Sequence, residues 1–327
     1  MPWAADRSPG SEGVKMRSNG VDLTEVDPLF ADAHSDFKSS RYAILGVPFD
    51  ATVSHRSGAA KAPGHIRTET YNFETYLMDL DVELEDVPIT DIGDLVVDNS
   101  ESGQQKMLVD VHNIFSLLLA EGKIPLMMGG EHSISEASVN AFMERFQKKG
   151  GMVIILDAHL DFRDDYLDNP HSHACVTRRL FDRWGEDSIF VIGVRSGCAK
   201  EVRDAEKLGL RYVTSRQVQT MNITDIIDDW DSGYSIRDRP IYLSVDIDGI
   251  DPAYAPGTGT PEPWGMTSWD VLRIMEELYH NILAMDVVEV SPEVERYATP
   301  ALAGKLIRQM IGLKEMKIKN PTWLEKV

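Results

Sequence analysis

Cysteine is scarce in this sequence, whose 327 residues include only Cys175 and Cys198. Neither residue belongs to a CxxC pair, and two thiols are too few for a disulfide framework. The composition therefore excludes the class of small disulfide-rich secreted proteins, and we expect a cytoplasmic protein.

Long hydrophobic runs are also lacking, because no apolar segment approaches the ~18 residues of a membrane span. Residues 1–20 contain no basic stretch followed by an apolar segment, so they do not have the pattern of a secretory signal. The middle of the chain has no internal repeat, low-complexity tract or Pro/Gly-rich linker. We expect a flexible polar tail over residues 1–30 and a single domain over residues 31–327, with no membrane contact.

Basic residues are outnumbered, with 33 Lys and Arg against 53 Asp and Glu and a formal net charge of -20 at pH 7. Such an anionic surface argues against a nucleic-acid partner and favours cationic ligands. Solubility or a saline habitat explains the acidity equally well, so the charge supports a cationic ligand only weakly.

What the sequence does contain is a series of apolar, β-branched segments that alternate with segments of helical period. Strands that are apolar on nearly every residue are typical of a parallel sheet covered by helices on both faces. We predict an α/β fold with three layers, α-β-α, around a largely parallel central sheet. The expected strands are 41–49, 123–130, 151–159, 188–195, 239–248 and 282–290, and the expected helices are 105–122, 134–150, 174–185 and 268–281.

The segment LDAHLD ends one of these strands and places Asp157, His159 and Asp161 on alternate residues. Side chains two residues apart share a face of a strand, so two carboxylates and an imidazole converge. Such groups repel one another and lose hydration unless a cation compensates them. Taken alone, the segment is explained equally well by capping of the strand end and a surface histidine.

Three other strand ends carry residues of the same kind. Glu131 and His132 lie in GGEHS, where two glycines allow a tight turn, Asp246 and Asp248 share a face in DIDGIDP, and Glu289 lies in DVVEVSP. Each of these is explained singly by capping, a turn or surface charge. Ligand sites of such sheets lie beyond the carboxyl ends of the strands, so together they predict a metal centre. The predicted ligands are His132, Asp157, His159, Asp161, Asp246 and Asp248.

The composition of this ligand set indicates the number and kind of metal ions. Four carboxylates at one edge require more than one divalent cation, and six ligands suffice for two ions about 3.5–4 Å apart. Oxygen-rich sites with a minority of imidazoles suit Mn²⁺, whereas structural zinc prefers thiolates. We therefore expect two Mn²⁺ ions, with Zn²⁺, Co²⁺, Ni²⁺ and Fe²⁺ as alternatives.

In their order and approximate spacing, the motifs GGEHS, DAHLD and SVDIDGIDPAYAPGTGTPEPWG resemble those of the ureohydrolases, the family of arginase, agmatinase and their relatives. The resemblance extends from LGVPFDATVSHRSGAAKAPGHIR (45–67) through DVVEVSP (286–292). It implies an arginase-like fold. Within the family, the sequence is most similar in appearance to archaeal-type agmatinases. The implied reaction is hydrolysis of a guanidino compound to urea and an amine by a hydroxide that bridges two Mn ions.

The resemblance also implies roles for single residues. The family's metal ligands fall on the six residues predicted above, and its guanidinium-binding glutamate falls on Glu289. Its proton-shuttling histidine falls in HSHACV, where the commoner form is His-Gly. The SHACV form favours His173, and His171 is the alternative. Glu131 in place of the commoner Asp and Leu160 in place of the commoner Thr are further departures, and neither removes a ligand.

Physical chemistry supports the implied mechanism. A guanidinium carbon is a poor electrophile, and two divalent cations lower the pKa of water enough to hold it as hydroxide. A carboxylate pairs with guanidinium N–H groups in a bidentate way, which is the role implied for Glu289. We expect Asp161 to accept the proton of the hydroxide and His173 to protonate the departing amine.

The expected substrate is a small cationic guanidino compound, in the first place agmatine, cleaved to putrescine and urea. The Asn- and Ser-bearing loop of arginase is not recognisable after DAHLD, and Asp164 and Asp165 suit a decarboxylated cation. Arg163, Arg178 or Arg179 would suit guanidinobutyrate. Arginase, aminopropylagmatine ureohydrolase and formiminoglutamase activities are further alternatives, as is a catalytically silent metal-binding homologue. The resemblance also implies a homo-oligomer, either a trimer or a hexamer.

Overall fold

The computed structural model describes residues 16–18 and 20–316, and a 10-stranded sheet forms its centre. From β6 to β10 each strand pairs in parallel with its neighbour, whereas β1 and β2 are antiparallel additions at one edge. In spatial order the strands are β1 (Met16–Ser18), β2 (Val21–Thr24), β6 (Ile89–Leu95), β3 (Tyr42–Gly46), β7 (Ile124–Met128), β12 (Ile282–Val288), β11 (Ile241–Asp246), β8 (Met152–Leu156), β9 (Ile189–Val194) and β10 (Arg211–Thr214).

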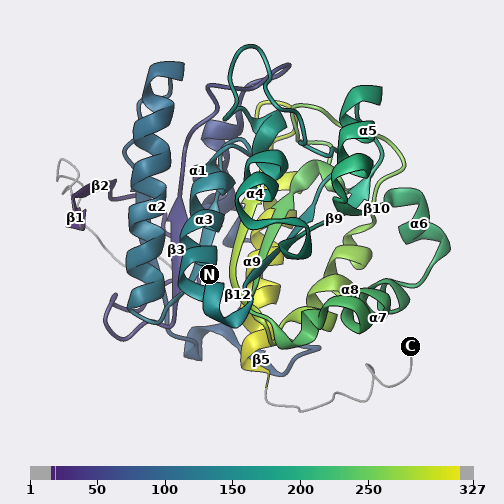
Figure 1. Ribbon diagram of the computed structural model, residues 1–327. Helices are drawn as coiled ribbons and strands as arrows, with labels where there is room; N and C mark the ends of the chain where they lie inside the picture. The colour runs from purple at the N-terminus through teal and green to yellow at the C-terminus, as the bar shows by residue number, and fades with distance from the viewer. Residues whose placement is uncertain (1–15, 19, 317–327) are drawn as a thin grey trace.

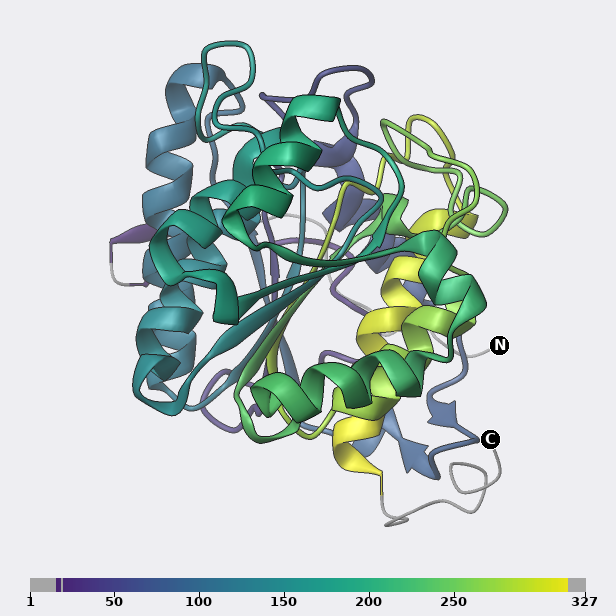
Figure 2. The ribbon, with the colours of Figure 1, turned by 45° about the vertical axis from the view of Figure 1, so that its right-hand side comes forward.

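Helices cover both faces of this sheet (Figures 1 and 2). Buried side chains form two separate apolar clusters, and successive residues of one strand, such as Tyr242 and Leu243 of β11, belong to different clusters. The structure is therefore the predicted three-layer α/β fold with a largely parallel sheet. One layer contains α2 (Gln104–Ala120), α3 (Ile134–Phe146), α4 (Val176–Trp184) and α5 (Ala199–Leu208), and the other contains α1 (Ala62–Thr70), α6 (Ser215–Thr220), α7 (Ile223–Tyr234), α8 (Ser268–Leu278) and α9 (Ala298–Glu315).

All the strands and helices predicted from the sequence are present, but the prediction omitted several elements. Strand β6 is an instructive omission, because its sequence ITDIGDL contains two acidic residues. Asp91 and Asp94 are compensated by Arg67 of α1, whose guanidinium nitrogens lie 2.7 and 2.6 Å from their carboxylates. An ion pair between a strand and the helix that covers it thus allows a polar sequence to occupy the interior of the sheet.

The domain begins earlier in the sequence than predicted. Leu23 of β2 pairs with Leu95 of β6, and Val21, Leu23 and Phe30 are buried. Residues 21–30 are therefore part of the fold, because their apolar side chains are covered, and the expected flexible tail over 1–30 extends too far. Residues 1–15 lie outside the described part of the chain.

Helices α6, α7 and α8 begin at residues whose side chains accept a backbone N–H of the first turn. Helix α8 begins with a capping box in which the backbone N–H of Asp270 donates to Thr267 Oγ1 over 3.1 Å and Asp270 Oδ2 accepts from the backbone N–H of Thr267. Its inward residues, among them Val271 and Ile274, are buried against the sheet. Within residues 16–18 and 20–316, no helix combines the length and the apolar composition that crossing a bilayer requires.

Candidate active site and metal centre

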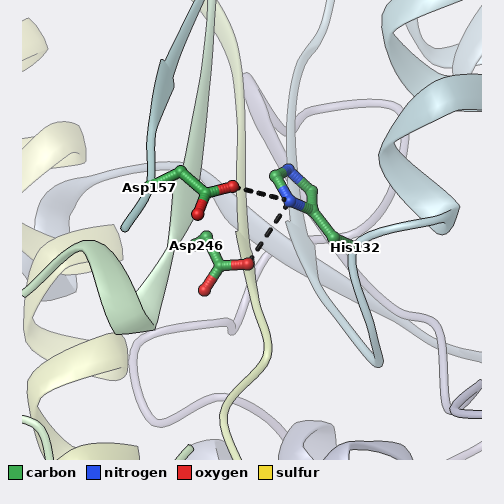
Figure 3. Close-up of side chains that lie close together, drawn as sticks. All are labelled: His132, Asp157 and Asp246. Carbon is green, nitrogen blue, oxygen red and sulfur yellow. Dashed lines mark ion pairs between the residues drawn. The ribbon is translucent and has the colours of Figure 1, made fainter. Parts of the chain in front are cut away.

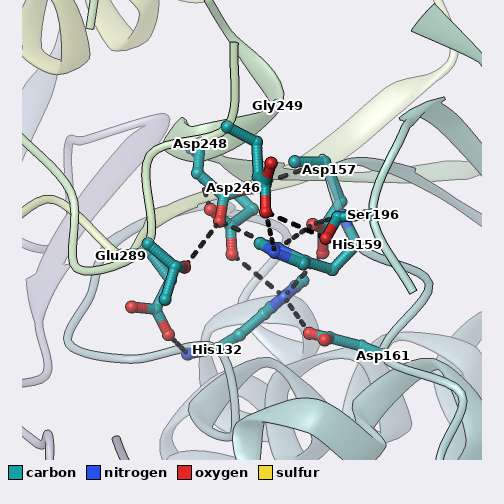
Figure 4. Close-up of polar contacts among 12 residues, drawn as sticks. His132, Asp157, His159, Asp161, Ser196, Asp246, Asp248, Gly249 and Glu289 are labelled. Carbon is teal, nitrogen blue, oxygen red and sulfur yellow. Dashed lines mark hydrogen bonds and ion pairs between the residues drawn. The ribbon is translucent and has the colours of Figure 1, made fainter. Parts of the chain in front are cut away.

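The strand order brings the acidic and imidazole residues together. Strands β7, β12, β11 and β8 are consecutive neighbours in the sheet, although they are far apart in sequence. The chain leaving their carboxyl ends carries all the predicted ligands and Glu289. Figure 4 shows these side chains converging on one region beyond the strand ends. The sequence prediction that one edge collects them therefore matches the geometry.

His132 lies at the centre of one group of carboxylates (Figure 3). Its Nδ1 atom lies 3.2 Å from Asp157 Oδ2, 3.1 Å from Asp161 Oδ2 and 3.3 Å from Asp246 Oδ2. All four side chains are nearly completely buried. His132, Asp157 and Asp246 each place one ligand atom within 4.8 Å of the others, which is compatible with a single cation between them.

A second group shares Asp157 with the first and contains His159 and Asp248. His159 Nδ1 lies 3.0 Å from Asp248 Oδ2 and 3.6 Å from Asp157 Oδ1. Backbone N–H groups orient both carboxylates, because that of His159 donates to Asp157 over 2.6 Å and that of Ala158 donates to Asp248 over 3.1 Å. Two groups with one shared carboxylate are the arrangement expected of a dinuclear centre with a bridging ligand.

The donor chemistry of this cluster fits divalent cations. Asp157 Oδ2 is buried and accepts no hydrogen bond, although a buried carboxylate oxygen is costly to leave without a partner. Asp246, Asp248 and Asp161 add three more carboxylates within the same small volume, and only two imidazoles oppose them. Carboxylate oxygens with a minority of imidazole nitrogens are the ligands of Mn²⁺ and similar ions, and no cysteine takes part.

Burial and the crowding of carboxylates also shift the pKa values of the residues in this cluster. Burial by itself would lower the pKa of His132, but the surrounding carboxylates of Asp157, Asp161 and Asp246 raise it well above its usual range. Burial and the charge of Asp157 raise the pKa of Asp161, and burial together with the charge of Asp248 raises that of Asp246. These buried carboxylates repel one another, and a cation bound among them would relieve that repulsion.

The backbone at two of the strand ends adopts a rare conformation. Asp161 has a φ of 46° and Glu289 a φ of 61°, which are left-handed values that residues other than glycine seldom adopt. Such strain is frequently found at functional sites, where the surrounding structure maintains it. The glycines of GGEHS have a different role from the predicted tight turn. A Cβ on Gly130 would lie 1.8 Å from the carbonyl oxygen of Phe49, so close approach of two backbones excludes a side chain there.

A cavity of about 320 Å³ opens onto this cluster of His and Asp residues. Asp161, Asp246, Asp248, Glu289 and His159 form part of its wall, together with Ser54, Arg163, Tyr166, His173, Ala174, Ser196, Gly197, Cys198, Glu201 and Thr260. The loop-borne members of the wall, such as Tyr166 and Thr260, were missed from the sequence. Tyr166 lies in no recognisable motif, whereas Thr260 lies in the PGTGTPE part of the third motif, where no role was assigned to it. Only the fold shows that both residues reach the cavity.

The structure separates the two candidate shuttle histidines. His173 lines the cavity, its ring stands edge-on to that of Tyr166 with centroids 5.7 Å apart, and its backbone N–H donates to Thr52 Oγ1 over 3.2 Å. Burial lowers the pKa of His173 to about 4. His171 instead lies 2.9 Å from Glu136 and faces a different groove, between α2 and α3. The geometry therefore favours His173, although its pKa lies below the near-neutral value expected of a shuttle.

The charged residues that follow DAHLD differ in their surroundings. Arg163 lines the cavity, lies over the ring of Tyr166 and has its Nε 3.8 Å from Glu201. Arg179 pairs with the exposed Asp164 over 2.9 Å, so neither charge is directed to the metal cluster. Of the basic residues considered for a guanidinobutyrate site, the structure places Arg163 alone in the cavity wall, where a carboxylate offsets its charge.

Comparison with known proteins agrees with the geometry. Residues 40–312 match the model of the arginase family. The chain is 36% identical to the N(1)-aminopropylagmatine ureohydrolase of Thermococcus kodakarensis, with 84% of this chain and 91% of that protein covered, and 34% identical to the agmatinase of Pyrococcus horikoshii, with 85% and 93% covered. The solved structure of the agmatine ureohydrolase of Thermoplasma volcanium superposes with a TM-score of 0.81 at 36% identity, over 91% of this chain and 96% of that one. The chain therefore belongs to the arginase family.

Proposed function

We propose that this protein hydrolyses agmatine to putrescine and urea at a centre of two Mn²⁺ ions. The observation that carries the proposal is the pair of buried His and Asp groups that share Asp157. His132, Asp157, Asp161 and Asp246 would hold one ion and Asp157, His159 and Asp248 the other. When bound, two such cations lower the pKa of water and so supply a nucleophile at neutral pH.

The residues around the cluster would orient the substrate. Glu289 lines the cavity, and a carboxylate pairs well with the N–H groups of a guanidinium. The backbone N–H of His132 donates to Glu289 Oε1 over 2.8 Å, which fixes the carboxylate relative to the ligand cluster. A substrate held there would have its guanidinium carbon beside the cluster, and correct positioning of two reactants supplies a large part of catalysis.

Two residues would move the proton that the reaction transfers. The Asp161 carboxylate accepts the proton released when water attacks the guanidinium carbon. His173 carries the proton on Nε2 and delivers it to the departing amine. The other ring nitrogen, Nδ1, faces Ser172, whose Oγ lies 3.2 Å away. Protonation of the amine makes it a good leaving group and completes the release of urea.

Agmatine is favoured among the guanidino compounds by the charge of the cavity. Glu201 and Glu289 are carboxylates of the wall, and Arg163 is adjacent to Glu201, so the wall has no isolated cation for a substrate carboxylate. The similarity to an N(1)-aminopropylagmatine ureohydrolase supports a longer cationic substrate as the second candidate. Both candidates end in an amine rather than a carboxylate.

The test is release of urea by protein loaded with Mn²⁺, with a chelated sample as control. Agmatine, N(1)-aminopropylagmatine, arginine and 4-guanidinobutyrate are compared at equal concentration, and formamide release from formiminoglutamate is measured in parallel. We expect metal-dependent urea release, fastest from agmatine. A preference for 4-guanidinobutyrate that Arg163→Gln abolishes would contradict the proposed substrate, and absence of activity on every compound would favour a catalytically silent homologue.

We also propose that the enzyme works in the cytoplasm as a homo-oligomer, either a trimer or a hexamer. The free thiols of Cys175 and Cys198 support a reducing compartment. Several large apolar side chains are exposed, among them Met78 at 80% and Trp269 at 64%, which supports a covered surface in the assembly. Light scattering coupled to size exclusion measures the mass, and a monomer would contradict the proposed assembly.

A further inference from the structure

A chain of buried polar groups leads from the predicted metal ligand His132 into the protein interior. His132 Nε2 lies 3.2 Å from Ser244 Oγ, and Ser244 Oγ donates to Asp286 Oδ1 over 2.7 Å. Asp286 Oδ2 accepts hydrogen bonds from the hydroxyls of Tyr242 and Ser135, each over 2.7 Å. All five side chains are at most 1% exposed. Neither Ser244 nor Asp286 belongs to the ligand set or lines the cavity, so their polar contacts serve another purpose.

Secondary structure fixes this row of buried polar groups in place. Ser244 and Asp286 are directly paired residues of β11 and β12, and Tyr242 lies two positions before Ser244 on the same face of β11. Ser135 comes from α3, the helix that follows GGEHS. The Tyr242 ring packs edge-on against Phe142 of α3 with centroids 5.6 Å apart. The strand pairing, helix α3 and the aromatic contact all hold Asp286 and its donors. These polar groups therefore form a rigid support behind His132.

The hydrogen-bonding capacity of each group decides which of them donate and which accept. An ionised carboxylate only accepts, so the three hydroxyls around Asp286 all donate to it. The single hydroxyl hydrogen of Ser244 is thus used on Asp286, and Ser244 is left to accept from His132 Nε2–H. A histidine that binds a metal does so as the neutral imidazole, which carries one proton, and this network assigns that proton to Nε2. Nδ1 then has a free lone pair, and it is the atom that lies 3.1–3.3 Å from the carboxylates of Asp157, Asp161 and Asp246.

A lone pair directed at three carboxylates is repulsive, and a cation between them converts the same arrangement into a ligand set. We infer that Asp286 is a positioning residue which, through Ser244, holds His132 in the Nε2–H tautomer with Nδ1 directed at the metal. The inference rests on the proposed metal centre. Metal-binding histidines generally donate their second ring N–H to a carboxylate, carbonyl or water. Here a serine hydroxyl lies between the histidine and the carboxylate.

The test is Mn²⁺ binding by the full chain, measured by competition with a chelating dye and by counting bound metal. Ser244→Ala removes the acceptor of Nε2–H, and loss of such a partner typically weakens metal binding about 10- to 100-fold. We expect this loss for one of the two metal equivalents, that of the His132 group, with the other changed little. Ser244→Thr keeps the hydroxyl and restores the wild-type affinity.

Asp286→Ala frees the hydroxyl of Ser244 to donate to Nε2, which favours the wrong tautomer, so it produces the same loss. Both residues act through one hydrogen bond, and the double variant therefore loses no more affinity than the more severe single variant. The matched control is Asp32→Asn, which changes a buried carboxylate paired with Arg308 over 2.7 Å. This control lowers the free energy of unfolding but leaves the metal affinity unchanged. Ser244→Ala removes a single hydroxyl and decides the question if Asp286→Ala does not fold.

A second readout is ¹⁵N NMR of the histidine-labelled protein loaded with diamagnetic Zn²⁺, which identifies the protonated ring nitrogen. We expect His132 to carry its proton on Nε2. An Nδ1–H tautomer, or wild-type affinity in both Ser244→Ala and Asp286→Ala, overturns the inference alone. Absence of metal binding by the wild-type protein overturns the proposed metal centre and this inference with it.

Discussion

Glu289 accepts a hydrogen bond from the backbone N–H of His132 over 2.8 Å. The contact joins the end of β12 to the segment that follows β7, two strands that are neighbours in the sheet. Burial and the nearby charge of Glu131 raise the pKa of Glu289 well above its usual range. A guanidinium bound at this position would offset that charge and favour the ionised form of Glu289.

Glu289→Gln separates the charge of this residue from its shape. The amide oxygen can still accept from His132, so we expect both metals to remain bound. Hydrogen bonds to charged groups contribute about 1.5–3 kcal/mol, so kcat/KM for agmatine should fall about 10- to 100-fold. Steady-state kinetics and metal analysis measure the two effects. Glu293→Gln is the control, because Glu293 is exposed and pairs with Lys61. Loss of metal from Glu289→Gln would contradict a role in substrate binding alone.

Asp161→Ala should abolish activity and reduce metal content. The carboxylate lies 3.1 Å from His132 Nδ1, and its left-handed backbone directs it to the cluster. Metal analysis after dialysis and urea release measure the result. Asp164→Ala removes a carboxylate three residues further on that is exposed and pairs with Arg179, so it should keep both metals and the activity. Full activity of Asp161→Ala would exclude the residue from the mechanism.

His173→Ala should slow turnover and leave both metals bound, because its side chain lines the cavity without belonging to either metal group. General acid catalysis typically contributes about 10²- to 10⁴-fold, which bounds the expected loss in kcat. His171→Ala should have near wild-type activity, since His171 pairs with Glu136 away from the cavity. The opposite result, with only His171→Ala impaired, would reverse the assignment of the shuttle.

Arg67→Met should strongly destabilise the protein. It removes the partner of Asp91 and Asp94 in the sheet, and the side chain of Asp91 is completely buried. Breaking a buried pair by removing one partner typically costs about 3–5 kcal/mol. Arg41→Met is the matched control, because Arg41 and Glu315 form a partly exposed pair worth at most about 1 kcal/mol. Urea denaturation of the two variants gives the comparison, and equal free energies of unfolding would exclude the buried pair as a major support of β6.

Glu276 predicts a pH dependence of stability. Burial raises the pKa of Glu276 to about 7, so the folded protein holds a proton that the unfolded chain releases near the ordinary glutamate pKa of about 4.5. The free energy of unfolding therefore falls as pH rises from about 4.5 to about 7. Glu276→Gln removes this effect, so the variant should exceed the wild-type stability by about 1 kcal/mol at pH 8, allowing for partial exposure, and by less at pH 5. An equal difference at both pH values would contradict the raised pKa.

The meeting of the clustered His and Asp residues at one sheet edge was predictable from the sequence, because they follow apolar segments that form neighbouring strands. The predicted sharing of one strand face by the side chains of DAHLD and of DIDG is wrong, because β8 ends at Leu156, Asp161 has a left-handed backbone and Asp248 lies in a 3-10 turn after β11. The rule that carboxyl ends of parallel strands meet at one sheet edge nevertheless places both motifs together. The SHACV form favoured His173 over His171, and in the structure the pairing of His171 with Glu136 separates the two histidines. Ser244 and Asp286 left a weak signal as polar residues inside otherwise apolar strands.

Other features depend on contacts between distant segments. Gly130 is required by the approach of Phe49, which comes from the segment after β3. Strand β6 is stabilised by Arg67. Its residues Asp91 and Asp94, which pair with Arg67, make the sequence of β6 unlike that of a buried strand. Strand β2 is short and has mostly polar residues around it, so only its pairing with β1 and β6 reveals it. In each case the contact that explains the feature comes from a residue far away in sequence, so the local sequence alone does not predict it.

The cluster residues lie at the ends of strands in the interior of the sheet, whereas Tyr166, Cys198 and Thr260 reach the cavity from the intervening loops. Reactive centre and substrate mouth therefore belong to parts of the chain with different tolerance to substitution. A lineage can alter the loops and acquire a longer or differently charged amine without disturbing the chemistry beneath. This division gives a physical reason why one scaffold supports related enzymes that differ in the tail of the molecule they cleave.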